Sequence, residues 1–390
     1  MADSASSPVA DGLRFLAFYL PQYHPIPEND EWWGKGFTEW TNVGRARPLF
    51  RGHYQPHLPA ELGYYDLRLA EVREAQAALA ARFGIDGFCY YHYWFGGRRL
   101  LERPFSEVLG SGRPDFPFCL CWANENWTRV WDGGSHQILM SQEYSPADDY
   151  AHAEELAAAF ADSRYIKIDG RPVFLVYRAW ALPDPSGTAS RFREVAGSHH
   201  LPEPYLCAVE SYSEPRRDPS EIGFDAAVEF HPDPELGSAL TRPGLPTRAY
   251  RRLFDRGHPA RSGHEIRPYD AAVKAALARP QPGYKRFRSV MPSWDNSPRR
   301  AREGTIYVGS TPDRYGQWVR GIAKTFQPFS PEENLVFVNA WNEWAEGNHL
   351  EPDQKWGTAY LEANLRARVS SLESRGHSEP ATGAPAERSV

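Results

Sequence analysis

The feature that most constrains the fold of this chain is an alternation of short apolar runs with longer stretches of helical pattern. The runs are rich in β-branched and aromatic residues and are bounded by glycine, proline or polar residues, as expected of buried parallel strands. There are eight of them, at residues 14–20, 87–95, 117–123, 172–177, 204–210, 225–230, 286–292 and 335–341. Eight strands alternating with helices predict an α/β fold, a (β/α)8 TIM barrel. A doubly wound open sheet is the alternative, but no run leads into a glycine-rich phosphate loop.

Helical patterns follow most of the runs. The clearest covers residues 66–84, where apolar residues share one side and a glycine ends the pattern. Residues 145–162 begin with Ser-Pro and early acids, which is typical of a helix start. Further helical stretches cover 268–278, 311–326 and 356–374. The segment 231–265, rich in proline and arginine, interrupts the alternation, and we interpret it as a long ordered insertion or lid.

The length of 390 residues fits one large barrel. Residues 1–12 and 376–390 lack apolar periodicity and are predicted to be disordered tails, which leaves 13–375 as a single domain with extended loops. The N-terminus has no basic and apolar leader, and no apolar stretch approaches the ~20 residues that span a membrane. A cytoplasmic protein without a membrane span is therefore expected.

Charge and cysteine usage exclude several classes of function. The formal net charge of −6 gives no electrostatic case for binding nucleic acid. The four cysteines lie mostly inside apolar runs and read as buried free thiols, since a single C-x-C without a second pair is not a zinc motif. His24, His92 and His231 follow three different strands, and their convergence on a metal is the weaker interpretation. We expect no metal or other cofactor and make no prediction of oligomeric state.

Aromatic and polar residues follow every predicted strand, at the end of the barrel where such folds place their chemistry. A single histidine beside an aromatic ring is more often a packed residue than a ligand-binding one, but here all eight strand ends carry such residues. The substrate-binding candidates are Tyr23, His24, Tyr91, His92, Trp94, Trp122, Asn124, Glu125, Trp127, Glu210, Tyr212, Glu229, His231, Trp294, Asp295, Asn342 and Trp344. Aromatic rings stack on the faces of sugars, and polar groups pair with hydroxyls, so an oligosaccharide or polysaccharide is the expected partner.

The eighth run leads into the stretch NAWNEWAEGNHLEP, which holds Glu343 and Glu346. Read alone, two glutamates three positions apart are more often a solvated helix start than a catalytic pair. At the end of the eighth strand, facing seven other aromatic and polar strand ends, they become the best candidates for the acid and base that cleavage of a glycosidic bond requires. No phosphate cradle and no G-x-S-x-G elbow competes with them.

Four stretches together resemble a known family. LAFYLPQYHPIPENDEWWGKGFTEWTNV, GIDGFCYYHYWF, CWANENWTRVWDG and NAWNEWAEGNHLEP are similar, in the same order, to the WbsX-like proteins of bacterial polysaccharide gene clusters. Those proteins are related to glycoside hydrolase family 99, the endo-α-mannanase and endomannosidase barrels. The resemblance covers residues 14–370. The segment EWWGKGFTEWTNV is characteristic of the WbsX-like branch and not of the endomannosidases.

The resemblance implies an activity and roles for the two acids. In family 99 the catalytic carboxylates lie in a motif similar to N-E-W-x-E-G, which this chain matches at residues 342–347. It implies a retaining glycoside hydrolase that forms a 1,2-anhydro sugar, with Glu343 as base and Glu346 as acid. A manno-configured sugar, mannose or rhamnose, is then expected. Glu125 and Asp295 are interpreted as contacts to hydroxyls, and Glu125 also as a group that tunes a catalytic pKa.

Two other functions stay open at this point. WbsX-like proteins are often labelled glycosyltransferases, and a transferase of polysaccharide (O-antigen type) biosynthesis is the main alternative. A nucleotide-sugar transferase would normally carry a D-x-D motif, and the nearest match, HPDPE, has Asp233 followed by Glu235 in the second position. A carbohydrate-binding barrel without catalysis would be expected to lack one of the two acids, and both are present.

Overall fold

The computed structural model describes residues 12–129, 134–212, 214–233, 236, 264–300 and 304–376. The two predicted tails lie outside the described residues except for residues 12 and 376. The middle of the segment 231–265 also lies outside them. No described helix is long and apolar enough to cross a membrane.

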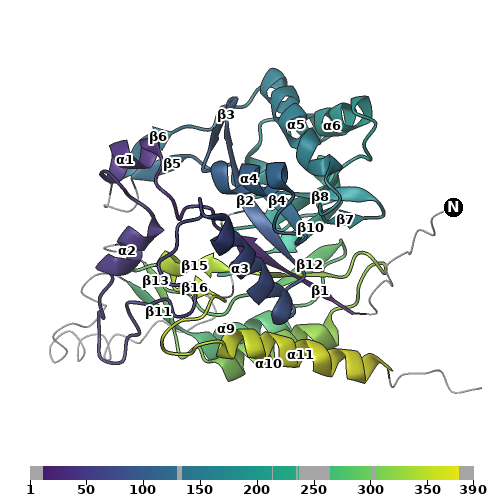
Figure 1. Cartoon of the computed structure of the whole chain (residues 1–390). Helices are drawn as coiled ribbons and strands as arrows, with labels where there is room; N and C mark the ends of the chain where they lie inside the picture. The colour runs from purple at the N-terminus through teal and green to yellow at the C-terminus, as the bar shows by residue number, and fades with distance from the viewer. Residues whose placement is uncertain are drawn as a thin grey trace, which may run out of the picture.

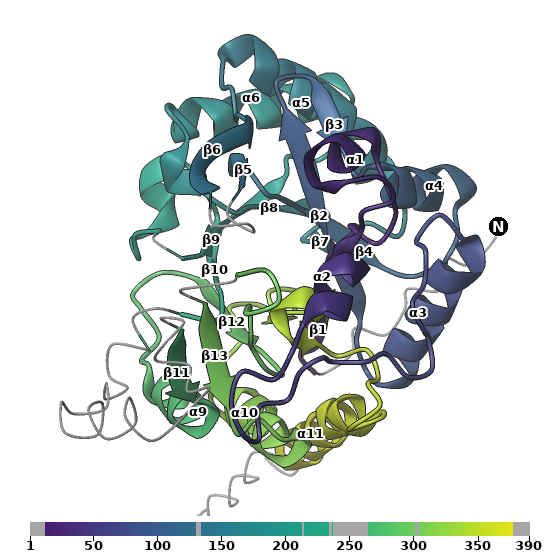
Figure 2. The ribbon, with the colours of Figure 1, turned by 90° about the vertical axis from the view of Figure 1, so that its left-hand side faces the viewer.

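Eight parallel strands close into a barrel in the order β1-β14-β12-β10-β9-β8-β4-β2, with β2 pairing back to β1 (Figures 1 and 2). They are β1 (Arg14–Tyr19), β2 (Gly87–Phe95), β4 (Phe118–Trp122), β8 (Arg171–Val176), β9 (Tyr205–Glu210), β10 (Ala226–Glu229), β12 (Arg286–Val290) and β14 (Leu335–Val338). Each overlaps a predicted apolar run, so the (β/α)8 barrel is confirmed. The four cysteines are free and buried, as predicted.

The strands are apolar throughout because both of their faces are covered. In β14 all four residues, Leu335–Val338, have no exposed surface, since one face fills the barrel and the other packs under helices. The surrounding helices are α3 (Ala70–Arg82), α4 (Arg103–Ser111), α5 (Pro146–Ala161), α6 (Pro185–Ser198), α9 (Tyr269–Ala278), α10 (Pro312–Thr325) and α11 (Ala359–Gly376). Between β9 and β10 the described residues form the 3-10 turn η3 (Pro219–Ile222) instead of a full helix.

The helix starts predicted from the sequence agree with the hydrogen bonds that cap these helices in the structure. The side chain of Ser145 accepts a hydrogen bond from the backbone nitrogen of Asp148, and proline occupies the first turn of α5. Thr311 caps α10 in the same way, again followed by proline. These caps satisfy backbone donors that a helix start leaves unpaired.

The carboxyl ends of all eight strands meet at one end of the barrel, on the left in Figure 1 and facing the viewer in Figure 2. Short elements gather there, none of which was predicted. They are α1 (Pro27–Trp33), α2 (Glu39–Arg45), the hairpin β5 (Trp127–Arg129) with β6 (Gly134–Met140), the pair β11 (Glu265–Pro268) with β13 (Thr305–Val308), and the hairpin β15 (Asn342–Glu343) with β16 (Asn348–His349). The remaining short elements are β3 (Arg98–Leu100), β7 (Lys167–Ile168), and the 3-10 turns η2 (Ala179–Ala181) and η5 (Trp344–Glu346).

Candidate active site

The turn that follows the eighth strand is tied to the end of the first. Asn342 accepts a hydrogen bond from the Leu20 backbone nitrogen at 2.8 Å, and its Nδ2 donates to the Leu20 carbonyl at 3.0 Å. The Tyr23 hydroxyl bonds to the Asn342 carbonyl and accepts from the backbone nitrogen of Trp344 at 3.2 Å. Asn342 and Tyr23 were both predicted to bind substrate. Their polar groups instead form the hydrogen bonds that hold this turn in place.

Glu343 and Glu346 meet at a single guanidinium. Arg299 Nη2 donates to Glu343 Oε2 at 2.7 Å, and Nη1 lies 2.9 Å from Glu346 Oε1. A third carboxylate joins them, because Arg299 Nε donates to Glu39 Oε2 at 3.1 Å. The structure thus brings the two predicted glutamates together. Arg299 and Glu39 were not among the sequence candidates.

Accessibility differs among these side chains. Glu39 is fully covered, and Glu343 and Arg299 are 7% and 12% exposed. Glu346 is the most accessible carboxylate of the three, with 18% of its side chain exposed. Glu346 is therefore the carboxylate that a ligand entering from solvent reaches most easily.

Arg299 contacts all three carboxyl groups and Arg300 adds a weaker positive charge near Glu346, so the carboxyl groups outnumber the cations. Burial raises the pKa of Glu343 to about 8; Arg299 opposes this rise, and Glu346 and Glu39 add to it. Burial also raises the pKa of Glu346, again against the effect of Arg299. For Arg299, burial acts to lower the pKa, but the carboxylates raise it well above its ordinary value. The cluster therefore keeps a proton on its carboxyl pair at neutral pH, as acid–base sites do.

Aromatic residues stand beside this cluster. Burial raises the pKa of the Tyr93 hydroxyl, and the charge of Glu343 adds to the rise, so Tyr93 lies within the range of that charge. The half-buried Trp127 contacts the Tyr93 ring, with centroids 5.2 Å apart, and the Trp32 ring of α1 at 5.7 Å. Burial also raises the pKa of the Tyr91 hydroxyl, and the charges of Tyr177 and then Glu343 add to the rise. Of the predicted aromatic residues, Trp127 and Tyr91 fit a wall of the carboxylate site.

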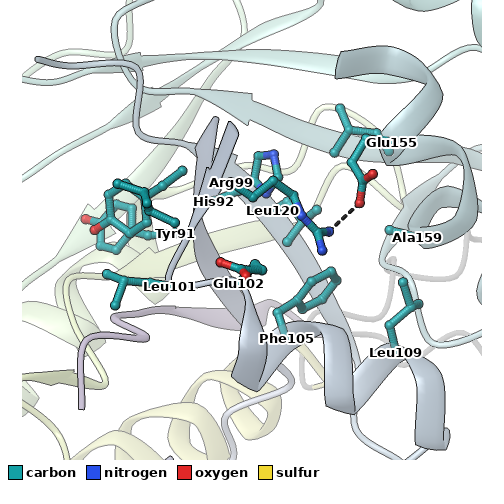
Figure 3. Close-up of a pocket in the computed structure, with 13 residues that line it drawn as sticks. Tyr91, His92, Arg99, Leu101, Glu102, Phe105, Leu109, Leu120, Glu155 and Ala159 are labelled. Carbon is teal, nitrogen blue, oxygen red and sulfur yellow. Dashed lines mark hydrogen bonds and ion pairs between the residues drawn. The ribbon is translucent and has the colours of Figure 1, made fainter. Parts of the chain in front are cut away.

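Three predicted aromatic positions lie elsewhere. His92 Nε2 is 2.9 Å from His152 Nε2 in α5, and Trp94 Nε1 donates to Asp148 in the same helix at 3.0 Å. The Trp122 ring lies 4.6 Å from the His152 ring. Figure 3 shows the pocket on this side of β2, where Arg99 pairs with Glu155 while Tyr91 projects to the other side. His92, Trp94 and Trp122 pack the barrel wall onto α5, which corrects their interpretation as sugar platforms.

Glu210, Glu229 and His231 also face the outer layer. Glu229 Oε2 accepts from Arg288 Nε at 2.8 Å, and both side chains are buried. Glu210 lies directly beside Glu229 in the strand register. The His231 ring packs on Trp318 of α10, with centroids 4.8 Å apart. These three residues support the helical layer and do not line the carboxylate site, contrary to the prediction.

Polar residues of the loop after β4 hold that loop in place through hydrogen bonds and an ion pair. Asn124 Oδ1 accepts from the Arg178 backbone nitrogen at 2.7 Å, so its amide has a structural partner. Glu125 pairs with the Arg178 guanidinium at 2.7 Å but keeps 48% of its side chain exposed. Tyr212 is 63% exposed. Glu125 and Tyr212 therefore stay accessible to a ligand, whereas Asn124 does not.

Asp295 and Trp294 lie next to Glu346, because the Asp295 backbone nitrogen donates to the Glu346 carbonyl at 2.6 Å. The Asp295 carboxylate, however, is held by His53 Nε2 at 2.7 Å and Gln55 Nε2 at 2.6 Å. It anchors the segment that carries His53 and Gln55, and its other oxygen, Oδ1, accepts from the Ser297 backbone nitrogen at 2.9 Å. The predicted contact to substrate is thus replaced by a structural role.

Two further candidates are enclosed. Trp344 donates from Nε1 to Glu351 at 2.6 Å, and its ring stacks on His349 at 3.7 Å, so the indole is no exposed platform. His24 is buried, with Nδ1 3.0 Å from the Pro21 carbonyl, and desolvation lowers its pKa to about 4. Both side chains stabilise loops at this end of the barrel.

Gly347 ends the turn with φ of +55°, and a β-carbon there would lie 3.2 Å from the Asp295 β-carbon. Replacing it by alanine should lower the free energy of unfolding by about 1–2 kcal/mol, because an L-residue is strained in this region. Gly110→Ala in α4 is the matched control, with no atom within 4 Å of the added carbon, and should be neutral or slightly stabilising. Denaturant unfolding of both variants measures the difference; equal effects would contradict the assignment.

A closed parallel barrel with paired carboxylates at its carboxyl end defines a class, the TIM-barrel proteins with the fold of glycoside hydrolases. Among solved structures the chain is similar to a glycoside hydrolase-like protein, at 13% identity, TM-score 0.57 and coverage of 94% of this chain and 97% of that one. It is also similar to the GH99 endo-α-mannosidase from Bacteroides thetaiotaomicron, at 13% identity, TM-score 0.55 and coverage of 93% and 98%. These identities show the fold alone. Residues 15–364 match the family model described as Glycosyltransferase WbsX, and the chain belongs to that family.

The chain is also similar to curated proteins. The chain is 44% identical over 353 residues to the uncharacterized protein WxcX from two strains of Xanthomonas campestris pv. campestris. The match covers 90% of this chain and 49% of the relative, so the chain spans about half the length of the curated relatives it matches. The resemblance to WbsX-like proteins, and their relation in fold to family 99, is confirmed.

Proposed function

We propose that this protein is a retaining glycoside hydrolase that cleaves α-linked, manno-configured sugars, mannosides or rhamnosides, in a bacterial glycan. The observation that carries the proposal is the meeting of Glu343 and Glu346 at Arg299, with the pKa values of both carboxyls raised. Two carboxyl groups that share a proton at neutral pH supply the acid and the base that glycoside cleavage needs.

In the first step Glu343 removes the proton of the substrate 2-hydroxyl as O2 attacks C1. The C1–O bond to the leaving group breaks, Glu346 protonates the leaving oxygen, and a 1,2-anhydro sugar forms. In the second step Glu346 takes a proton from water, whose oxygen attacks C1. The C1–O2 bond of the epoxide breaks, and Glu343 returns the proton to O2. Two inversions at C1 give net retention.

The positions of the two carboxylates suit these roles. Glu346 is the more exposed of the pair, which fits a group that meets first the leaving oxygen and then water. The first step needs the shared proton on Glu346. Arg299 contacts both carboxylates and so stabilises either one as the anion, which makes this arrangement accessible.

The chemistry selects the substrate. Attack by O2 from behind requires O2 and the leaving group to be trans across C1–C2, a condition met when both are axial. α-D-Mannose and α-L-rhamnose satisfy it, and an α-glucoside does not. The aromatic wall of Tyr93, Trp127 and Trp32 offers faces on which such a sugar can stack.

The second candidate is a glycosyltransferase of polysaccharide biosynthesis, which the description of the family favours. A nucleotide-sugar donor brings a diphosphate, which needs positive charge around it. The cluster has three carboxyl groups around Arg299, with Arg300 as a weaker charge near Glu346, so its carboxyl groups outnumber its cations and disfavour a diphosphate. This balance favours the hydrolase.

The test is a screen of purified protein against α-mannosyl and α-rhamnosyl oligosaccharides, with the anomer of the first product read by NMR. We expect hydrolysis with retention, and no reaction of the matching 2-deoxy substrate, since it lacks the attacking oxygen. Inverted product would exclude the mechanism. Transfer only after a nucleotide sugar is added would establish the second candidate.

The pH profile of kcat/KM should be bell-shaped, because the active form holds one proton on the Glu343–Glu346 pair. Loss of that proton predicts an alkaline limb near pH 8, where burial places the pKa of Glu343. The acid limb should lie above the ordinary glutamate value of 4.5, because burial also raises the pKa of Glu346. Steady-state rates across the pH range measure this; full activity below pH 4, or constant activity above pH 9, would contradict it.

A further inference from the structure

A second cluster of potential ligands lies under the turn that carries the glutamates. One donor atom from each of His57, His349 and Asp353 lies within 4.8 Å of the other two, and all three residues are buried. We propose that these residues bind a divalent transition-metal ion. Two imidazoles and one carboxylate are a donor set that suits Zn²⁺ and leaves a fourth position for water.

The hydrogen bonds around His349 prepare it as a ligand. Its Nδ1 lies 2.8 Å from the Glu351 carbonyl, which can only accept, so Nδ1 carries the proton. Nε2 then bears a lone pair, and it points at His57 Nδ1, 2.8 Å away. A backbone carbonyl that fixes the other ring nitrogen is the usual support of a metal-binding histidine.

Asp353 offers one oxygen in the same direction. Its Oδ1 accepts from the backbone nitrogens of Lys355 at 2.9 Å and Trp356 at 2.6 Å, which fixes the carboxylate plane. Its Oδ2 lies 3.9 Å from His349 Nε2. The nearby Asp295 is already held by His53, whereas Asp353 also has a hydrogen bond with the Tyr54 hydroxyl, a neutral group that does not cancel the carboxylate charge.

A proton between the two imidazoles is the metal-free alternative, since His57 Nδ1 can donate to His349 Nε2 at the observed 2.8 Å. A zinc ion with Zn–N distances of about 2.0–2.1 Å would replace that proton after the rings separate by roughly half an ångström. The proton and the zinc ion would each bridge His57 Nδ1 and His349 Nε2, so a measurement of metal binding distinguishes the two states.

The location indicates what the ion would do. A β-carbon added to Gly347 would lie 3.4 Å from His57 Cε1, so the cluster directly supports the turn that follows Glu346. The ion would link the segment of His57 to the hairpin β15–β16 and to Asp353. This is a stabilising role for the candidate active site, and it does not depend on the proposed hydrolase activity.

The test uses untagged wild-type protein stripped with EDTA and then titrated with Zn²⁺ by calorimetry. We expect one equivalent to bind and the melting temperature to rise, because a ligand of the native state stabilises it by mass action. Co²⁺ added instead should give the strong visible absorption of a four-coordinate site. Both measurements use the wild-type protein, so their outcome does not depend on whether any variant folds.

Variants then assign the site. His57→Gln and Asp353→Asn should each weaken Zn²⁺ binding at least tenfold, whereas His53→Gln should bind as the wild type does, since His53 faces Asp295. Absence of a one-to-one binding event in the wild type would overturn the proposal. Undiminished affinity in both ligand variants would overturn it equally.

Discussion

A variant with methionine in place of Arg299 should lose about 3–5 kcal/mol of unfolding free energy at neutral pH, the usual cost of removing one partner from a buried ion pair. Arg299 is the shared partner of Glu39, Glu343 and Glu346, so its removal leaves three enclosed carboxyl groups facing one another. Methionine keeps the unbranched apolar stem of the side chain and removes the charged end. Denaturant unfolding of wild type and variant gives the difference.

The loss should depend on pH in a definite direction. The folded-state pKa of Glu343, about 8, lies above the ordinary 4.5, so this group favours folding when protonated and loses that contribution as the pH rises toward 8. Without Arg299 the carboxylates lose the cation that contacts all three of them, and Arg300 offsets only part of the charge on Glu346. The destabilisation by Arg299→Met should therefore be larger at pH 8 than at pH 5.

Arg300→Met is the matched control. It removes the same charge at the next position of the chain and leaves the three ion pairs of Arg299 in place. Arg300 lowers the pKa of Glu346 through its charge, but less than Arg299 does, so its loss should cost less stability and depend less on pH. Equal losses in the two variants would mean that the cluster contributes no more than general charge balance.

The barrel was predictable because its strands are covered on both faces. Continuous apolar runs such as Leu335–Val338 need no partner to be recognised. The short elements at the carboxyl end were missed for the opposite reason. Helices α1 and α2 have seven residues each, too few to show a helical period, and the two-residue strands of the β15–β16 hairpin carry no alternation.

The two glutamates were predictable from their place after the eighth strand, but their partners were not. Arg299 is 44 positions from Glu343 and 260 from Glu39, and all three side chains come from segments without periodicity. Local sequence carries no signal for an ion pair at such separation. The segment EWWGKGFTEWTNV, which contains Glu39 and Trp32, drew attention only through its resemblance to WbsX-like proteins, which assigned neither residue a role.

Several site candidates lie away from the carboxylate pair because residues on both faces of a strand end were counted together. Successive side chains of β2 point to opposite faces, so Tyr91 and Tyr93 turn toward the carboxylates while His92 and Trp94 turn toward α5. The same alternation sends Glu229 to the outer layer. Applying the two-residue period at the end of each strand separates these groups from sequence alone.

Replacing Glu343 and Glu346 by glutamine, one at a time, should give two different kinetic patterns. Glu343→Gln removes the base that activates the 2-hydroxyl, so kcat should fall by about 10²–10⁴-fold on every substrate, whatever its leaving group. Glu346→Gln removes the proton donor. Its loss should be of similar size on an α-mannosyl oligosaccharide, whose leaving alcohol needs a proton, and much smaller for bond cleavage in an aryl α-mannoside, whose phenolate leaves unaided.

With the aryl substrate, Glu346→Gln should also release a rapid burst of phenol followed by slow turnover, because the same carboxyl is needed to activate water against the anhydro sugar. Glu343→Gln should show no burst. Glu351→Gln serves as the control, since Glu351 is a buried carboxyl that accepts hydrogen bonds from Trp344, Tyr65 and Gln76. If both glutamine variants lost activity equally on both substrates, without a burst, the division of roles between Glu343 and Glu346 would be wrong. If both kept full activity, the reaction would not use this pair at all.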